Sequence, residues 1–134
     1  MTTQAKGSFT VKMTPLTWSE SSVDRTLTRY QIEKLFLGDL EGVSEGQMLG
    51  AGSPQSGSAG YVAIEKVTGK IDGRSGAFVL QHSGSMNHGD LTLTISVVPD
   101  SGTGELAGLA GNMTINIADG KHSYEFAYTL GTIQ

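Results

Sequence analysis

The chain contains no cysteine, which excludes disulfide bonds, thiolate metal sites and a cysteine nucleophile. Positive charge is also scarce: nine Lys and Arg face thirteen Asp and Glu, the formal net charge is −4, and the basic residues form no stripe. We therefore expect no nucleic-acid partner. No apolar run approaches the roughly 18 residues of a membrane helix, and no hydrophobic signal core follows Met1. We expect a cytoplasmic protein with no membrane partner.

Helical periodicity is missing too, because no segment of ten or more residues repeats its apolar side chains every 3.6 positions. Glycine is abundant, at 19 of 134 residues, yet Val, Ile, Leu, Phe and Tyr recur through most of the chain, which argues against disorder. We interpret the glycines as turns, bulges and bends. The length suits one domain, so the sequence predicts a single all-β domain over residues 1–134.

Alternation of apolar and polar residues predicts strands, since a strand with one buried face repeats every two residues. We expect Pro15 to end the first alternating run, Pro99 to end the third, and a shift of parity near Leu35 to mark a bulge. Gly50–Gly60, rich in Gly and Ser, is expected to be a mobile loop. The alternating runs are Phe9–Met13, Arg25–Leu40, Leu91–Val97, Met113–Ile117 and Tyr124–Leu130.

Two hairpins can be placed from turn residues. Asp119-Gly120 lies between two alternating runs, which is the strongest short hairpin signal, and it pairs Ile117 with His122. A second turn is expected over Asp72–Ser75, as a four-residue loop or a tight turn of the same register.

A short pattern of the form Gly-polar-aliphatic-x-Gly occurs three times, at Gly38–Gly42, Gly69–Gly73 and Gly104–Gly108. Glycines placed regularly in strands let a sheet bend sharply enough to close. We therefore expect the sheet to form a small closed barrel, and we favour this structural role over a ligand-binding loop.

Several of these residues belong to longer motifs: Gly38–Gly42, Ile64–His82 and Ser101–Gly111, with Trp18 before them and His122–Leu130 after them. Together they closely resemble an uncharacterised bacterial family with an allene oxide cyclase-like barrel, related in fold to dirigent proteins. The resemblance covers nearly the whole chain. It implies an eight-stranded antiparallel closed barrel and a homo-oligomer. The fold relatives bind hydrophobic or phenolic small molecules in the barrel, but the family itself has no established activity, so no catalytic residue is carried over.

The second hairpin sets Glu65 opposite His82 among apolar neighbours. A carboxylate facing an imidazole in such surroundings could fix the ring's tautomer and act in acid–base chemistry. A structural cross-strand pair near a rim, or a solvated pair, is the alternative. We expect Trp18, Tyr61, Glu65, Phe78 and His82 to line a ligand site, although a lone Trp in a small barrel is also a common core residue.

Other motifs carry less. His82, His88 and His122 do not have ligand spacing, since the first two are separated by an expected loop over Ser83–Asn87, so we expect no metal site. Gly42–Gly46 matches the nucleophile-elbow pattern G-x-S-x-G but lacks the helix that this motif requires. No cofactor is expected.

The sequence leaves three functions open. The leading one is binding of a hydrophobic or aromatic small molecule inside the barrel. The second is an isomerase or cyclase that holds a reactive conformer, with Glu65 and His82 as acid and base. The third is a ligand-free oligomeric module, because Val62, Ile64 and Val79 make the opposite strand face apolar as well.

Overall fold

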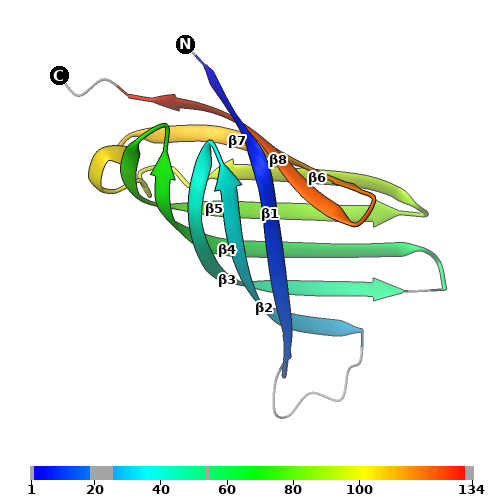
Figure 1. Ribbon diagram of the computed structural model, residues 1–134. Helices are drawn as coiled ribbons and strands as arrows, with labels where there is room; N and C mark the ends of the chain where they lie inside the picture. Colours follow the sequence, from blue (N-terminus) through cyan, green and yellow to red (C-terminus); the bar gives the residue numbers. More distant parts are fainter. Residues whose placement is uncertain (1, 19–25, 54, 132–134) are drawn as a thin grey trace.

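The computed structural model describes residues 2–18, 26–53 and 55–131 (Figure 1). Within these residues the chain forms eight strands and one 3₁₀ turn, in agreement with the predicted all-β class. The elements are β1 (Thr3–Leu16), β2 (Leu27–Gly38), β3 (Leu40–Ser53), β4 (Ser58–Ile71), β5 (Arg74–Asn87), β6 (Asp90–Val97), η1 (Gly104–Leu106), β7 (Leu109–Ala118) and β8 (Lys121–Leu130).

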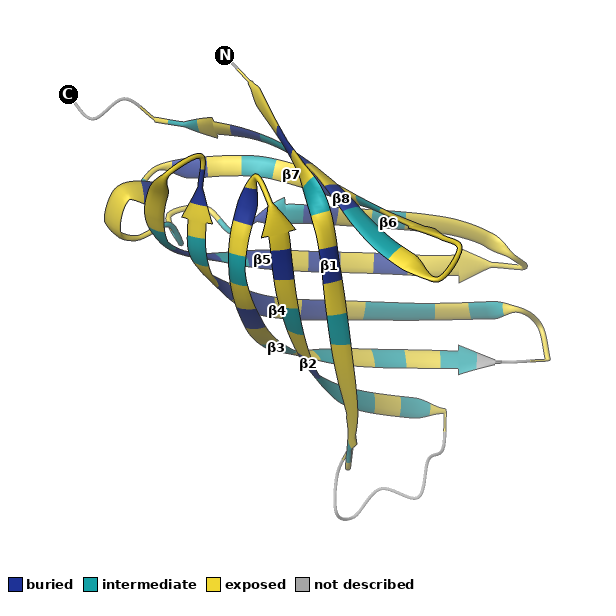
Figure 2. Cartoon of the chain, viewed as in Figure 1, coloured by how far each residue is buried: buried dark blue, intermediate teal, exposed yellow. Residues whose placement is uncertain are grey.

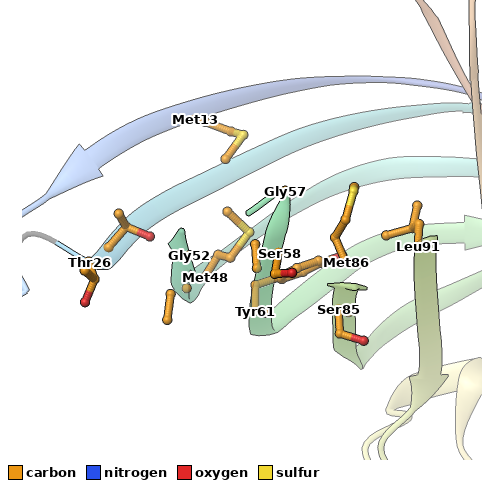
Figure 3. A pocket seen from close by; sticks show the side chains of 16 residues that line it. Met13, Thr26, Met48, Gly52, Gly57, Ser58, Tyr61, Ser85, Met86 and Leu91 are labelled. Atoms are coloured by element: carbon orange, nitrogen blue, oxygen red, sulfur yellow. The ribbon is translucent and has the colours of Figure 1, made fainter. Parts of the chain in front are cut away.

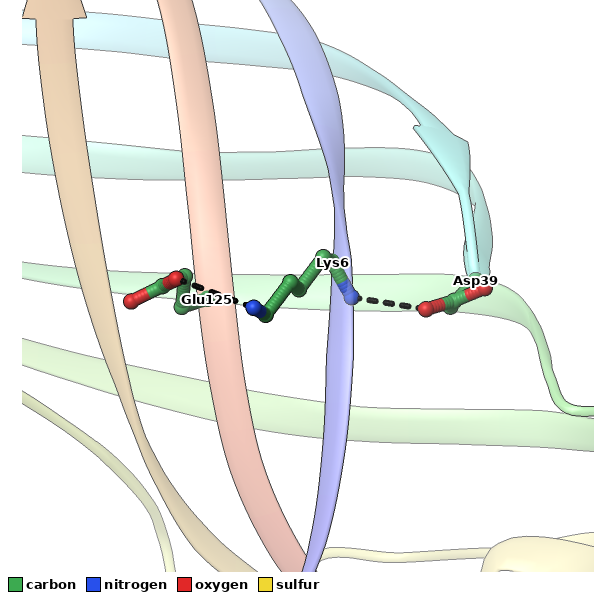
Figure 4. A network of polar contacts seen from close by, with 3 residues as sticks. All are labelled: Lys6, Asp39 and Glu125. Carbon is green, nitrogen blue, oxygen red and sulfur yellow. Dashed lines mark hydrogen bonds and ion pairs between the residues drawn. The ribbon is translucent and has the colours of Figure 1, made fainter.

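The eight strands close into a barrel in chain order, each antiparallel to its neighbours, and β1 pairs with β8 to complete the ring. The predicted closed antiparallel barrel is therefore confirmed. At the closure Lys6 joins three segments, because its Nζ lies 3.5 Å from Oε1 of Glu125 and its backbone N–H donates to Asp39 at 2.9 Å (Figure 4). Both side chains of the ion pair are more than half exposed, so this pair contributes little to stability.

The barrel is open at one end because some strands extend beyond the ends of their neighbours. Strand β8 pairs with β1 from Thr3 to Phe9, so the C-terminal half of β1 has β2 alone as its partner. Strand β6 pairs with β7 at Ile95 and Ser96, so its N-terminal half has β5 alone. The unpaired edges of β1 and β6 leave a gap in the barrel wall, and the long ends of β3, β4 and β5 lie opposite this gap (Figure 1).

The core fills the other end of the barrel, and buried residues recur at alternate positions along the strands (Figure 2). The aliphatic residue of each repeat copy, Leu40, Ile71 or Leu106, has no exposed surface. The repeat also brings Gly42 opposite Gly69, where a Cβ on Gly69 would lie 2.1 Å from the Glu41 carbonyl oxygen. The repeat therefore has the expected structural role of letting two bent strands approach closely.

The predicted turn at Asp119-Gly120 is confirmed, with the expected pairing of Ile117 and His122. Its residues have φ of 53° and 74°, as a two-residue type I′ turn requires. His88-Gly89 repeats this geometry with φ of 50° and 92°.

The predicted turn over Asp72–Ser75 is wrong in length. Asp72 and Gly73, with φ of 50° and 84°, form a two-residue turn by themselves, so Ile71 pairs with Arg74. Strand β5 is therefore shifted by two residues from the expected register. A shift of two keeps every side chain on its predicted face, whereas a shift of one would reverse them all.

Two predictions for the N-terminal strands are also wrong. No bulge occurs near Leu35, because β2 pairs without interruption; Leu35 and Leu37 point outward while Phe36 is buried. Pro15 lies inside β1 opposite Tyr30, and its missing N–H is tolerated because that part of β1 is paired on one side.

Two expected loops are mostly strand. Gly50–Gly60 belongs largely to the ends of β3 and β4, where Gly50 pairs with Tyr61, and Ser83–Asn87 is the end of β5. Small residues at alternate positions suit a sheet face that borders a cavity. Their Gly- and Ser-rich composition led to the prediction of loops instead. Arg25, the expected start of the second strand, lies outside the described residues.

Candidate functional site

A buried polar cluster crosses three strands in the barrel interior. Oε2 of Glu65 on β4 lies 2.9 Å from Nζ of Lys34 on β2 and 3.5 Å from Nε2 of His82 on β5. Glu65 has no exposed surface, and His82 is 4% exposed. The predicted proximity of Glu65 and His82 is thus confirmed, although in the corrected register they are diagonal neighbours, with Glu65 opposite Leu80.

Sequence reasoning missed Lys34. The supposed bulge at Leu35 hid the true parity of β2, in which Tyr30, Ile32, Lys34 and Phe36 share the inward face. Nζ of Lys34 also lies 5.1 Å from the ring centroid of Phe9 and 5.8 Å from that of Phe36, so two aromatic faces stabilise its charge. The available signal was the alternation of Lys34 with the apolar Ile32 and Phe36, which places the lysine on the inward face.

Burial and two neighbouring side chains act in opposite directions on the pKa of Glu65. Burial alone would raise it, but the proximity of His82 and of the Lys34 charge outweighs burial and lowers the pKa below its ordinary value. Glu65 is therefore an anion paired with a buried cation.

The cluster leaves polar atoms without hydrogen-bond partners. Among the described residues these are both carboxylate oxygens of Glu65, Nε2 of His82 and Oγ of Ser44, although Oε2 of Glu65 still forms the ion pair with Lys34. Ser44 lies opposite Lys34 in the β2–β3 register. A buried polar atom without a partner costs about 1–3 kcal/mol, so natural proteins retain few of them without a reason.

An apolar pocket of about 740 Å³ occupies the open end of the barrel. Three of the five methionines contribute to it, together with Tyr61, Leu91 and several glycines. In Figure 3 Met13, Met48 and Met86 reach into it from different strands. Methionine is flexible and polarizable, so these walls can adapt to different apolar shapes.

The pocket includes one of the predicted ligand residues, Tyr61. Glu65 and His82 are not among its lining residues, and Phe78 is a core residue whose ring stacks on that of Phe126 at 5.8 Å. Trp18, just after β1, is 37% exposed and belongs to neither the pocket nor the buried core.

Tyr61 connects the pocket to the cluster. Its ring lies over Gly84, where an added Cβ would be 2.4 Å from Cε1 of Tyr61. Its pKa is raised, first by burial and then by the negative charge of Glu65. The inward-facing residues along β4 are Tyr61, Ala63 and Glu65. The pocket residue Tyr61 and the cluster residue Glu65 are therefore about 13 Å apart along the strand.

A second polar region lies at the opposite end, where Asp39, Glu41 and Asp72 border a smaller depression. The Tyr128 hydroxyl donates to the Asp72 carboxylate, and burial followed by this contact raises the pKa of Tyr128 to about 12. Among the described residues, no three His, Asp or Glu side chains are arranged to hold a metal ion. No helix in the described part of the chain is long and apolar enough to span a bilayer.

Fold and site define a class of protein: a closed eight-stranded barrel with an apolar pocket next to a buried ion pair. Residues 5–128 match the family described as protein of unknown function DUF3224, and the chain belongs to this family. A crystal structure of a DUF3224 protein of unknown function from Shewanella oneidensis MR-1 is similar to it, with 47% identity, a TM-score of 0.92, and coverage of 99% of this chain and 100% of that one. The search of curated proteins gave no match.

Proposed function

We propose that the protein binds a hydrophobic small molecule in the open end of the barrel. The observation that carries this proposal is the apolar pocket of about 740 Å³, within the range typical of ligand sites. Met48, Tyr61 and Met86 would form its walls, with Glu65 and His82 beyond them. The closure of the sheet in chain order and the number of strands also support a relation to allene oxide cyclase-like barrels.

Titration with the neutral dye N-phenyl-1-naphthylamine tests this proposal, because the dye fluoresces strongly in apolar sites. Ala59 faces into the pocket, so Ala59→Trp is expected to block dye binding. Val62 is on the outer face of the same strand and 52% exposed, so Val62→Trp is the matched control and keeps binding. Equal dye binding by the two variants, or none by the unmodified protein, would refute a site in this pocket.

Catalysis is the second candidate, with Glu65 and His82 as base and acid of an isomerase or cyclase. The 3.5 Å approach of the two side chains favours it. The natural ligand should then be converted on incubation with the protein, which mass spectrometry of the recovered ligand detects. Conversion that disappears in His82→Ala supports these roles, and conversion that is unaffected contradicts them.

We also infer that copies of the chain associate through the outer face of β2–β4. Leu35, Leu37, Val43, Val62 and Ile64 on this face are 45–57% exposed, which is unusual for aliphatic side chains on one surface. Sedimentation velocity at low concentration is expected to show an oligomer that dissociates in Ile64→Lys. A monomer at every concentration would rule this out.

A further inference from the structure

The Lys34–Glu65 pair next to the pocket is electrically balanced, but the cluster around it is incompletely hydrogen-bonded. Lys34 and Glu65 form a close pair, so their charges cancel. Oε2 of Glu65 has Lys34 beside it, whereas Oε1 has no partner among the described residues. The carboxylate therefore retains one strong acceptor atom, Oε1, that no group of the described chain uses.

The side chains around Glu65 in the cluster retain a small exposed fraction. His82 is 4% exposed, Ser44 6%, and the Lys34 side chain 8%, while Glu65 itself has no exposed surface. These side chains lie on the inward face of their strands. On β5 the inward residue after His82 is Gly84, which lines the pocket about 7 Å further along the strand.

Balanced charge selects against a charged ligand. A carboxylate or an ammonium head would meet one attracting and one repelling charge at this pair, and either would lose its hydration without a net opposite charge to compensate. A neutral hydroxyl avoids this cost and can donate its proton to Oε1, and such hydrogen bonds to ionised acceptors are the stronger kind.

We propose that the pocket takes an apolar molecule that ends in a neutral hydroxyl group, and that this hydroxyl donates a hydrogen bond to Oε1 of Glu65. Glu65 is then the residue that determines specificity, and Lys34 holds it ionised. The inference rests on the proposed binding function and adds the chemical class of the ligand.

Four probes with one decyl chain test the head group by isothermal titration calorimetry: 1-decanol, decyl methyl ether, decylamine and decanoate. The alcohol can donate, whereas the ether can only accept. We expect 1-decanol to bind about tenfold tighter than the ether, as a hydrogen bond to a charged acceptor gives. The two charged probes are expected to bind more weakly than the alcohol.

A double variant locates the donated bond. Lys34→Met together with Glu65→Met removes the acceptor without leaving a buried charge, and alcohol and ether should then bind equally. Lys6→Met with Glu125→Met makes the same exchange at the exposed pair and should keep the preference. The ratio in the unmodified protein is itself a test that requires no variant.

The outcomes separate the two proposals. If alcohol and ether bind the unmodified protein equally, or a charged probe binds tightest, the inference is wrong while pocket binding stands. A preference for the alcohol that survives the cluster double variant also overturns it. If none of the four probes binds, the proposed function fails, and the inference fails with it.

Discussion

Glu65 is the residue on which the interior chemistry depends, because its charge is tolerated through Lys34. Two charges removed from water are costly, and the attraction between them repays that cost while both are present. The rings of Phe9 and Phe36 near Lys34 add to the pair. Removing one partner therefore differs from removing both.

At neutral pH, Glu65→Met alone is expected to reduce the free energy of unfolding by about 3–5 kcal/mol, because it leaves the Lys34 charge buried without its partner. Adding Lys34→Met to that variant should restore stability to the unmodified value or above it. Urea unfolding curves of the three proteins provide the measurement. A double variant as unstable as the single one would show that the pair itself is the main stabilising contact.

The lowered pKa of Glu65 gives a pH dependence with a definite sign. Because the pKa in the folded protein lies below the ordinary 4.5, ionised Glu65 stabilises the folded state above that pH, and this contribution is lost as pH falls through the folded-state pKa. Between pH 5 and pH 2 the unmodified protein should lose more stability than the Lys34→Met, Glu65→Met double variant. Urea unfolding at each pH measures this loss. Equal losses of stability in the two proteins would contradict the assigned ion pair.

At the scale of elements, turn chemistry and close strand contacts make different demands on glycine. Gly73 has a φ of 84° with no atom within 4 Å of an added Cβ, so only the backbone conformation requires glycine there. Gly69 has no such conformation, but its Cβ would lie 2.1 Å from the Glu41 carbonyl oxygen. One glycine serves a turn and the other a strand contact.

We predict that Gly73→Ala costs about 1–2 kcal/mol, the usual cost of a left-handed conformation for alanine. Gly69→Ala should cost about 3 kcal/mol or more, because β3 and β4 must move apart. Thermal unfolding of the two variants measures the difference. If Gly69→Ala were the milder change, close approach of the two strands at this point would not be what the glycine provides.

Sequence patterns predicted the faces of the C-terminal strands better than those of β2. In β8 the buried Tyr124, Phe126 and Tyr128 alternate with polar or small residues, and the hairpin before them has a distinctive turn. In β2 the outward Leu35 and Leu37 are as apolar as the inward Phe36, so periodicity could not distinguish the two faces. Lys34 was missed for that reason.

The interior site could be predicted in part. A two-residue error in the β4–β5 turn left Glu65 and His82 on one face, so their contact survived the wrong register. The pocket could not be predicted, because it depends on which strand ends are paired on one side instead of two. This follows from the relative lengths of strands that are distant in sequence.

For the whole molecule, the central feature is a barrel packed at one end and open at the other. The core methionine Met113 is 3% exposed, whereas Met13, Met48 and Met86 line the pocket. The methionine side chains therefore report on the two ends of the same barrel. A ligand in the open end would contact the second group and leave Met113 in its packed surroundings.

The most direct test of ligand binding is an NMR titration of the protein, labelled with ¹³C at its methionine methyl groups, with 1-decanol. We predict that the methyl signals of Met13, Met48 and Met86 shift in a saturable way while that of Met113 stays unchanged. The absence of saturable shifts in the three pocket methionines would contradict the account, as would shifts confined to Met113.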